Sequence, residues 1–252
     1  MNGKTIFPSD KIHAKEFPCG TNSICCAFST RHDGNVSFSH GDSANALANR
    51  KNFLRPLNID YGELVCSRQI HGPGVHYAKT EDIGRGALSN ANAIQKTDAF
   101  VTDIKRLPIA VFTADCLSIF IVDPETPAIG MVHAGWRSTS EKILSKTIDA
   151  MQKLFKTNPM NLQIAFGPAI RSCCYQVSPE FFSIFDCGLT QKNGRWYMDL
   201  IETNKKELSE LKIKNENIFD SEICTSCHND EFFSYRKEGA LCGRIMSVMM
   251  LR

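Results

Sequence analysis

The chain has 252 residues, of which 42% are hydrophobic, and its 29 basic and 27 acidic residues leave a formal net charge of +2. This near balance argues against a nucleic-acid-binding protein, which carries a basic stripe, and leaves small phosphate-bearing substrates open because these need only a few local cations. No stretch approaches the roughly 18–20 apolar residues of a membrane span, so we expect neither nucleic acid nor a membrane as partner. The length fits a single domain over residues 1–252, with 1–20 expected to be loosely ordered.

The N-terminal segment and the cysteines indicate in which cellular compartment we expect the protein. The segment MNGKTIFPSDKIHAKEF contains no apolar core like that of a secretory signal. The chain has eleven cysteines, and we expect most of them to be reduced in a cytoplasmic protein, because disulfides persist in oxidising compartments. Some of them are then small buried hydrophobic residues, and fewer are catalytic or metal-bound.

Apolar periodicity predicts strands and helices in irregular order. The expected strands are 22–31, 63–69, 75–78, 99–102, 162–166, 176–177, 196–200, 218–222 and 245–251, besides two apolar runs within 108–134. The expected helices are 44–57, a helix that follows a capping box at Ser138 and Glu141 and runs to Phe155, and 179–185 and 201–211. Irregular alternation favours a mixed α/β or α+β domain over a regular βαβ repeat.

The central segment 108–137 contains two apolar runs separated by the polar residues 123–127, which predicts a buried hairpin. A turn at residues 124–125 would place Cys116 opposite His133, with their Cβ atoms roughly 5 Å apart. Asp115 lies beside Cys116. His133 begins a strand-to-helix junction, and the backbone N–H groups of this junction could bind an anion. The hairpin therefore predicts a site built on a thiol and an imidazole.

A third candidate ligand, His71, follows the strand at 63–69 in the turn that begins at Gln69. Together with Cys116 and His133 it completes a set of three N and S ligands, which suits zinc with a fourth position open. Zinc-bound water has a pKa near ~7 and supplies hydroxide at neutral pH. The same set suits copper with an axial Met, and without a metal His133 could activate Cys116 as a nucleophile. The residues alone leave all three chemistries open.

Cys224 and Cys227 form a C-x-x-C pair, which occurs in redox and zinc sites. A structural zinc site needs two further ligands, and the sequence offers Cys173, Cys174 and His228 as candidates. We interpret the pair as buried or incidental.

Two arginines are candidates for binding an anion. Arg31 ends the first strand and Arg137 follows the junction after His133. Both lie at strand ends next to loops, where sites form, and a guanidinium binds phosphate or carboxylate in a bidentate manner. Arg236 and Arg244 are interpreted as surface residues.

Several stretches, in order from about residue 27 to the C-terminus, resemble the laccase-domain family of polyphenol oxidase-like (YfiH-type) proteins. They are FSTR (28–31), GD and NR within 41–50, QIHG (69–72), TDAFVT (97–102), TADCLSIFIVDP (113–124), HAGWR (133–137), FGPAI (166–170), and CTSC, FFSYRKEG and GR within 224–244. The combination of TADC, HAGWR and FFSYR is specific to this family.

The resemblance implies one α/β domain of mixed sheets packed face to face, with helices outside, in a four-layer arrangement. It implies metal binding by His71, Cys116 and His133, with zinc as the usual ligand and copper in older accounts. The implied activity is that of a purine nucleoside phosphorylase, a transferase acting on adenosine, inosine, guanosine and methylthioadenosine with phosphate. Hydrolytic deamination of adenosine at the same site is also implied.

We expect Arg31, with Arg137 second, to hold phosphate, and Asp115 and Gln69 to contact the substrate. Arg31 is also a candidate catalytic residue beside the three ligands. The chain departs from the family where Ser138 replaces a usual glycine, and where the loop after Arg31 lacks the usual Pro-Tyr and Leu-Asn-Leu signature. The sequence does not specify the oligomeric state, and a monomer is compatible with it.

A multicopper laccase builds its copper centres largely from His-x-His pairs, whereas this chain has seven histidines and no such pair. We therefore reject laccase chemistry as the native role and keep copper-dependent polyphenol oxidation only as a second choice. The sequence is also compatible with a metal-free cysteine hydrolase or amidase using Cys116 and His133, with editing of cell-wall precursors, and with a non-enzymatic partner role.

Overall fold

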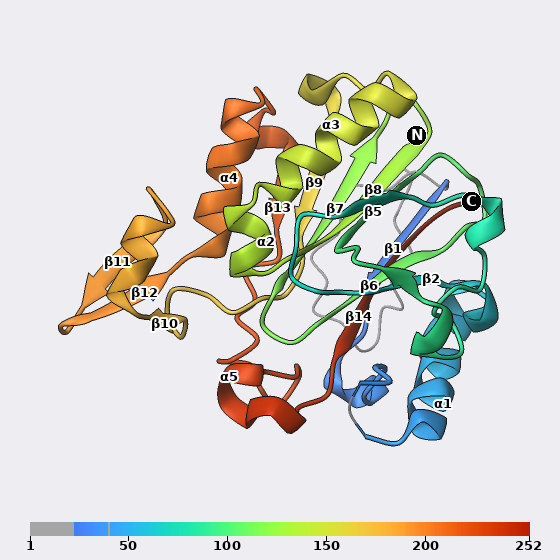
Figure 1. Ribbon diagram of the computed structural model, residues 1–252, viewed down its shortest axis with the longest axis horizontal. Coiled ribbons are helices and arrows are strands. Elements are labelled where there is room, and N and C mark those ends of the chain that lie inside the picture. Colours follow the sequence, from blue (N-terminus) through green and yellow to red (C-terminus); the bar gives the residue numbers. More distant parts are fainter. Residues whose placement is uncertain (1–22, 40) are drawn as a thin grey trace.

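The computed structural model describes residues 23–39 and 41–252 (Figure 1); the segment 1–20, expected to be loosely ordered, lies outside the described residues. Two mixed sheets carry the fold. The six-stranded sheet has the order β13 (Ile218–Asp220), β9 (Gln163–Phe166), β7 (Leu117–Asp123), β8 (Ala128–Ala134), β5 (Ala99–Thr102) and β3 (Val75–Tyr77). The five-stranded sheet has the order β1 (Ile24–Phe28), β14 (Ile245–Leu251), β6 (Ile109–Thr113), β2 (Val65–Arg68) and β4 (Ile94–Gln95).

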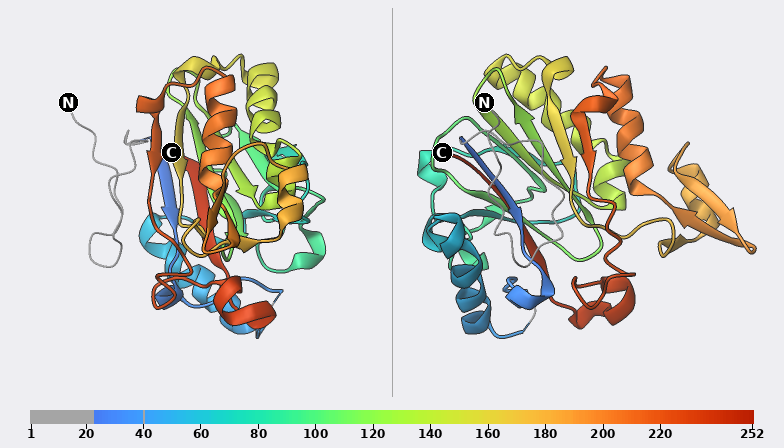
Figure 2. Two further views of the ribbon diagram at one scale, coloured as in Figure 1. Left: turned by 90° about the vertical axis from the view of Figure 1, so that its left-hand side faces the viewer. Right: turned by 180° about the vertical axis from the view of Figure 1, so that it is seen from behind.

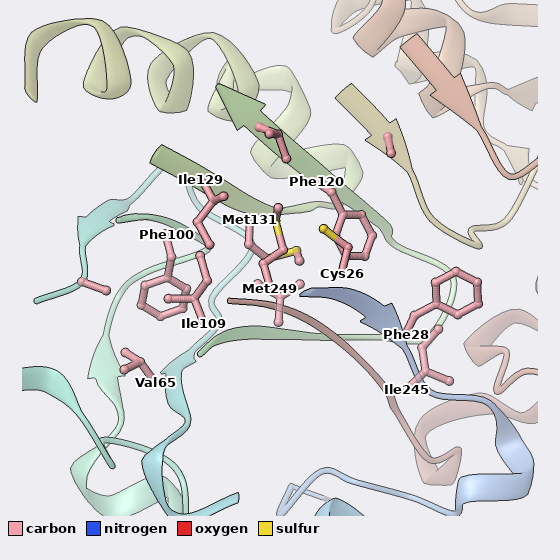
Figure 3. Packing of buried hydrophobic residues seen from close by; sticks show 14 of the residues in the cluster. Cys26, Phe28, Val65, Phe100, Ile109, Phe120, Ile129, Met131, Ile245 and Met249 are labelled. Atoms are coloured by element: carbon pink, nitrogen blue, oxygen red, sulfur yellow. The ribbon is translucent and has the colours of Figure 1, made fainter. Parts of the chain in front are cut away.

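The two sheets face each other across a largely apolar layer. Figure 3 shows Phe120 and Met131 of the six-stranded sheet opposite Ile109 and Met249 of the five-stranded sheet, and all four are fully buried. β7, β8 and β14 are buried along their whole lengths. Because both faces of such strands are covered, their sequences are nearly continuous apolar runs.

Helices cover the outer face of each sheet. Side chains of α3 (Ile143–Phe155) and α4 (Leu200–Glu210) pack on the six-stranded sheet. Side chains of α1 (Ser43–Leu54) pack on the five-stranded sheet, and Figure 2 shows α1 and α3 on opposite sides of the stacked sheets. The expected α/β fold with mixed sheets packed face to face between helices is confirmed.

Smaller elements lie outside these layers. A three-stranded sheet of β10 (Gln176–Val177), β12 (Arg195–Met198) and β11 (Leu189–Lys192) projects to the left in Figure 1. The short helix α5 (Tyr235–Glu238) lies near the end of the chain. The helix expected at 179–185 is a 3-10 helix, Pro179–Ser183. Within the described residues, no helix is long and apolar enough to cross a membrane.

The strands expected at 99–102 and 245–251 are confirmed with their predicted bounds, but the apolar run 108–123 is not one strand. β6 belongs to the five-stranded sheet and β7 to the six-stranded sheet. The chain crosses between them at residues 114–116, where Asp115 adopts the left-handed region with φ 81°. Hydropathy does not reveal this crossing, because Asp115 is a single polar residue between two apolar strands.

The predicted hairpin register is wrong by two residues. Asp123 pairs with Ala128, so the connection has four residues and not two, and Ser118 lies opposite His133. Because side chains alternate with a period of two, a shift by two keeps every residue on its predicted face.

The predicted capping box is also wrong. A separate helix, α2 (Trp136–Ser140), begins directly after Gly135. The Ser138 hydroxyl accepts a hydrogen bond from the Gly135 N–H at 3.0 Å. Lys142 then takes a left-handed conformation with φ 60°, and α3 begins after it.

Replacing Phe120 by alanine tests the layer between the sheets. Phe120→Ala is expected to lower the free energy of unfolding by about 3–5 kcal/mol, because it leaves a cavity in a fully buried site. Urea unfolding followed by circular dichroism measures the change. Leu154→Ala on α3, at a side chain that is 47% exposed, is the control and should change it by less than about 0.5 kcal/mol. Equal effects of the two variants would contradict this packing.

Candidate active site

Three predicted ligands meet where the chain crosses between the sheets. Cys116 lies in the crossing, His133 lies in β8, and His71 lies in the turn after β2. Their ligand atoms all lie within 4.8 Å of one another. The rings of His71 and His133 meet edge to face with their centroids 4.7 Å apart. The structure thus brings these three residues together despite the shifted hairpin register.

A carboxylate that the sequence analysis did not select, Asp98, holds the two histidines. Asp98 is fully buried directly before β5. It accepts hydrogen bonds from the backbone N–H groups of residues 70, 71 and 72, each at 3.0 Å. It also accepts one from Nδ1 of His133 at 2.8 Å, which leaves Nε2 of that ring for the sulfur or a metal. In the sequence, the one feature that could have indicated a role for Asp98 is its position in TDAF, where a polar residue directly precedes a buried strand.

The triad is electrostatically coupled. Burial alone would raise the pKa of the Cys116 thiol, but the charge of His133 and hydrogen bonds from both histidines lower it to about 6. Burial disfavours the charged form of His133, yet the Cys116 thiolate and the Asp98 carboxylate raise the pKa of His133 to about 9. Each of the two side chains therefore favours the charged form of the other.

The donor set fits a metal such as zinc. Two imidazoles and one thiolate are the ligands that zinc prefers, and three protein ligands are usual in catalytic zinc sites. The carboxylate of Asp98 on the far nitrogen of His133 is the outer partner that orients ligating histidines. Gly135 leaves room for the close approach, because a Cβ there would lie 3.0 Å from Cδ2 of His71 and 3.1 Å from Sγ of Cys116 and would crowd both side chains.

The triad opens into a cavity of about 990 Å³. Among the described residues that line it, Asp115 is the one acidic side chain, and the basic ones include Arg50, Arg68, Arg137, Arg236 and Arg244. Flat aromatic side chains also line it: Phe112, Trp136, Tyr175, Phe181 and Tyr235. The cavity therefore combines positive charge with apolar surfaces that suit a planar ring.

Arg137 lines this cavity, and its guanidinium lies 4.3 Å from the Trp136 ring. Arg31 is not among the lining residues. Its guanidinium donates to the carbonyls of Asn229 and Phe232 and pairs with Glu238. The structure thus places one of the two arginines predicted to hold phosphate beside the triad and the other in an ion pair away from it.

Asp115 and Gln69 both line the cavity, but their polar atoms bind the protein itself. The Asp115 carboxylate accepts from the Thr225 hydroxyl at 2.6 Å and from the Arg236 N–H at 2.7 Å. The Gln69 amide donates to the Phe112 carbonyl at 2.9 Å and accepts from the Phe112 N–H at 2.8 Å. Both side chains therefore shape the cavity wall.

The anion-binding site expected at the junction after His133 stays a prediction. The helix there, α2, has five residues, and the Gly135 N–H is bonded to Ser138. Arginine side chains also bring positive charge to the cavity.

Arg50 is a second cavity residue that sequence reasoning missed. It is 1% exposed and donates to the carbonyls of Val36, Gly86 and Ala87. Its guanidinium lies 3.9 Å from the ring centroid of Phe38. On a helix of otherwise low amphipathicity, nothing local distinguished it from a surface arginine.

A family model described as multi-copper polyphenol oxidoreductase laccase matches residues 26–252. Purine nucleoside phosphorylase YlmD of Geobacillus stearothermophilus is 30% identical, covering 82% of this chain and 78% of that protein. Adenosine deaminase RL5, from an unknown prokaryotic organism, is 29% identical, covering 81% and 80%. The crystal structure of YlmD from Geobacillus stearothermophilus superimposes with a TM-score of 0.88 at 28% identity, covering 92% of this chain and 93% of that one.

The role of Asp98 is tested by Asp98→Asn, which keeps the shape but loses the charge. Its amide cannot accept from all the donors that face it, so the histidines lose their fixed orientation. We expect the zinc affinity of the triad to fall about 10–100-fold, measured by competition with a chromophoric chelator. Asp123→Asn, at the far end of β7 and bonded to the turn N–H groups of Glu125 and Thr126, is the matched control. An unchanged affinity in Asp98→Asn would contradict the assignment.

Proposed function

We propose that this chain, which belongs to the family described as multi-copper polyphenol oxidoreductase laccase, is a zinc-dependent purine nucleoside phosphorylase. Its substrates are adenosine, inosine, guanosine and methylthioadenosine together with phosphate, and its products are the free base and ribose-1-phosphate. Hydrolytic deamination of adenosine is a second activity of the same site. The names of two relatives, a purine nucleoside phosphorylase and an adenosine deaminase, support this class of substrate.

The observation that carries the proposal is the composition of one cavity, in which three candidate metal ligands lie beside five arginines and a set of aromatic rings. Its volume of about 990 Å³ suits a nucleoside and a phosphate together, since small-molecule sites span roughly 300–1,000 Å³. Phosphate requires cations, and a purine requires a flat apolar surface, so one cavity meets both requirements.

His71, Cys116 and His133 are the residues that would hold the metal. The chemistry supplied by bound zinc is polarisation of a phosphoryl oxygen or a lowered pKa of water. The same N and S donors also suit copper, which is the alternative metal. Asp98 keeps Nδ1 of His133 occupied and so directs the opposite nitrogen of that ring toward the metal.

The remaining cavity residues bind and orient the two substrates. Arg137 and Arg68 are exposed on the cavity wall and would hold phosphate below C1′, where a guanidinium binds two oxygens at once. Tyr175 and Trp136 offer faces for the purine. As the bond from C1′ to the base breaks, an oxygen of hydrogen phosphate forms the new bond to C1′, and the leaving base gains the proton that hydrogen phosphate gives up. Holding phosphate and nucleoside in line supplies much of the rate enhancement.

Arg31 acts on this site at a distance. It binds the segment 229–238 through two carbonyls and Glu238, and that segment carries Tyr235 and Arg236 to the cavity wall. We therefore propose a positioning role for Arg31 and assign the phosphate contact to Arg137.

Incubation with inosine and phosphate tests the activity. We expect hypoxanthine and ribose-1-phosphate in equal amounts, and inosine from adenosine when phosphate is omitted. His71→Ala and Cys116→Ala should each lose the zinc ion of the triad and lower the rate on the order of 100-fold or more, since even outer partners of a metal ligand contribute 10–100-fold. His76→Ala, whose ring pairs with Asp82, is the control. Absence of both products with zinc-loaded protein would reject the proposal.

The adjacent Cys116 and His133 are also compatible with a metal-free cysteine hydrolase. Treatment with a chelator distinguishes this function from a zinc-dependent phosphorylase. A chelator should abolish activity and added zinc should restore it. Iodoacetamide should modify Cys116 in the metal-free protein and not in the zinc-loaded protein, as read by peptide mass spectrometry. Activity that survives chelation and disappears on alkylation of Cys116 would instead support the hydrolase.

A further inference from the structure

Four cysteines from two distant segments converge outside the active-site triad. Cys173 and Cys174 lie in the loop after β9, and Cys224 and Cys227 lie in the loop after β13. Because β9 and β13 are parallel neighbours, their carboxyl ends lie at the same edge of the sheet. A bridge between Ala169 and Cys224 continues this pairing into the loops. The topology thus brings a C-C pair against a C-x-x-C pair.

The sulfur atoms are spaced as in a tetrahedral thiolate site. The Cys227 sulfur lies 3.6 Å from that of Cys173 and 3.4 Å from that of Cys174, and all four sulfurs lie within 4.8 Å of one another. Zinc–sulfur bonds of about 2.3 Å in a tetrahedron place sulfurs roughly 3.8 Å apart. A disulfide would require two sulfurs to lie about 2.05 Å apart, which is much closer than the two distances from the Cys227 sulfur.

The C-x-x-C turn also presents backbone donors to one sulfur. The backbone N–H groups of Cys227, Arg171 and Ser226 and the thiol of Cys173 form hydrogen bonds with the Cys224 sulfur. Backbone N–H groups aimed at a sulfur stabilise a thiolate, which is the form that binds metal. The loop is therefore already folded around a ligand sulfur.

We infer that Cys173, Cys174, Cys224 and Cys227 bind one zinc ion as a closed tetrathiolate site. With four protein ligands it has no open position, so its role is structural, in contrast to the three-ligand triad. The cysteines bind as thiolates and release their protons on binding the ion.

One of the two loops that this ion would fasten lines the cavity, and the other lies behind it. Tyr175 and Gln176, next to Cys174, line the cavity. Arg236 donates to the carbonyls of Cys174 at 3.1 Å and of Gln176 at 2.9 Å. Thr225, inside the C-x-x-C turn, holds the Asp115 carboxylate beside Cys116. The site therefore fixes the substrate-facing wall.

Zinc content of the purified protein tests the inference. Cys227→Ser and Cys173→Ser remove exposed ligands whose loss leaves the core intact, and each should lose one zinc per chain relative to the wild type. Cys187→Ser, outside the cluster, should keep the full content. A chelator should lower the melting temperature of the wild type and of Cys187→Ser by more than that of Cys227→Ser.

A second measurement identifies the ligands of this zinc ion in a variant whose triad lacks its thiolate. In Cys116→Ala, which lacks the active-site thiolate, zinc X-ray absorption should show four sulfur neighbours at about 2.3 Å. Wild-type zinc content in both serine variants would overturn the inference. So would a disulfide among the four cysteines in protein purified with reductant, or iron with acid-labile sulfide in place of zinc.

Discussion

One buried carboxylate organises the active site. Asp98 has no exposed surface, and a buried charge is tolerated only where it is paired and hydrogen-bonded. Its oxygens accept from three consecutive backbone N–H groups and from His133, while its own carbonyl accepts from the His133 N–H. The turn that carries His71 and the strand that carries His133 are therefore fixed to the same group. The geometry of the triad follows from the requirement that this charge be satisfied.

The crossing of the chain between the two sheets provides the space for the site. Residues 114–116 leave β6 and enter β7 in the other sheet, and Asp115 takes a left-handed conformation to do so. Such a conformation has an energetic cost for a residue with a side chain. Here the Asp115 carboxylate is held by Thr225 and Arg236, so loops from the end of the chain stabilise the crossing. Cys116 is presented to the cavity as a result.

The two cysteine-containing clusters serve different purposes on this account. The triad offers three candidate ligands and faces a cavity, which suits chemistry at an open position. The four-cysteine cluster joins two loops at the edge of the six-stranded sheet, where short strands contribute few hydrogen bonds of their own. An ion at this edge would supply the rigidity that the short β13 does not, and rigid support is what a precise site requires.

Part of this protein follows from its sequence alone. The strands at 99–102 and 245–251 were predictable because burial on both faces leaves a continuous apolar run. Cys116 and His133 were correctly placed together although the turn was misjudged, because side-chain alternation makes a shift of two residues preserve the face.

Other features were decided by the tertiary structure. Arg31 pairs with Glu238, 207 residues away, and so turns from the cavity; the four cysteines meet because β9 and β13 lie side by side. Local patterns record which residues are buried, whereas partners between distant segments depend on which strands become neighbours.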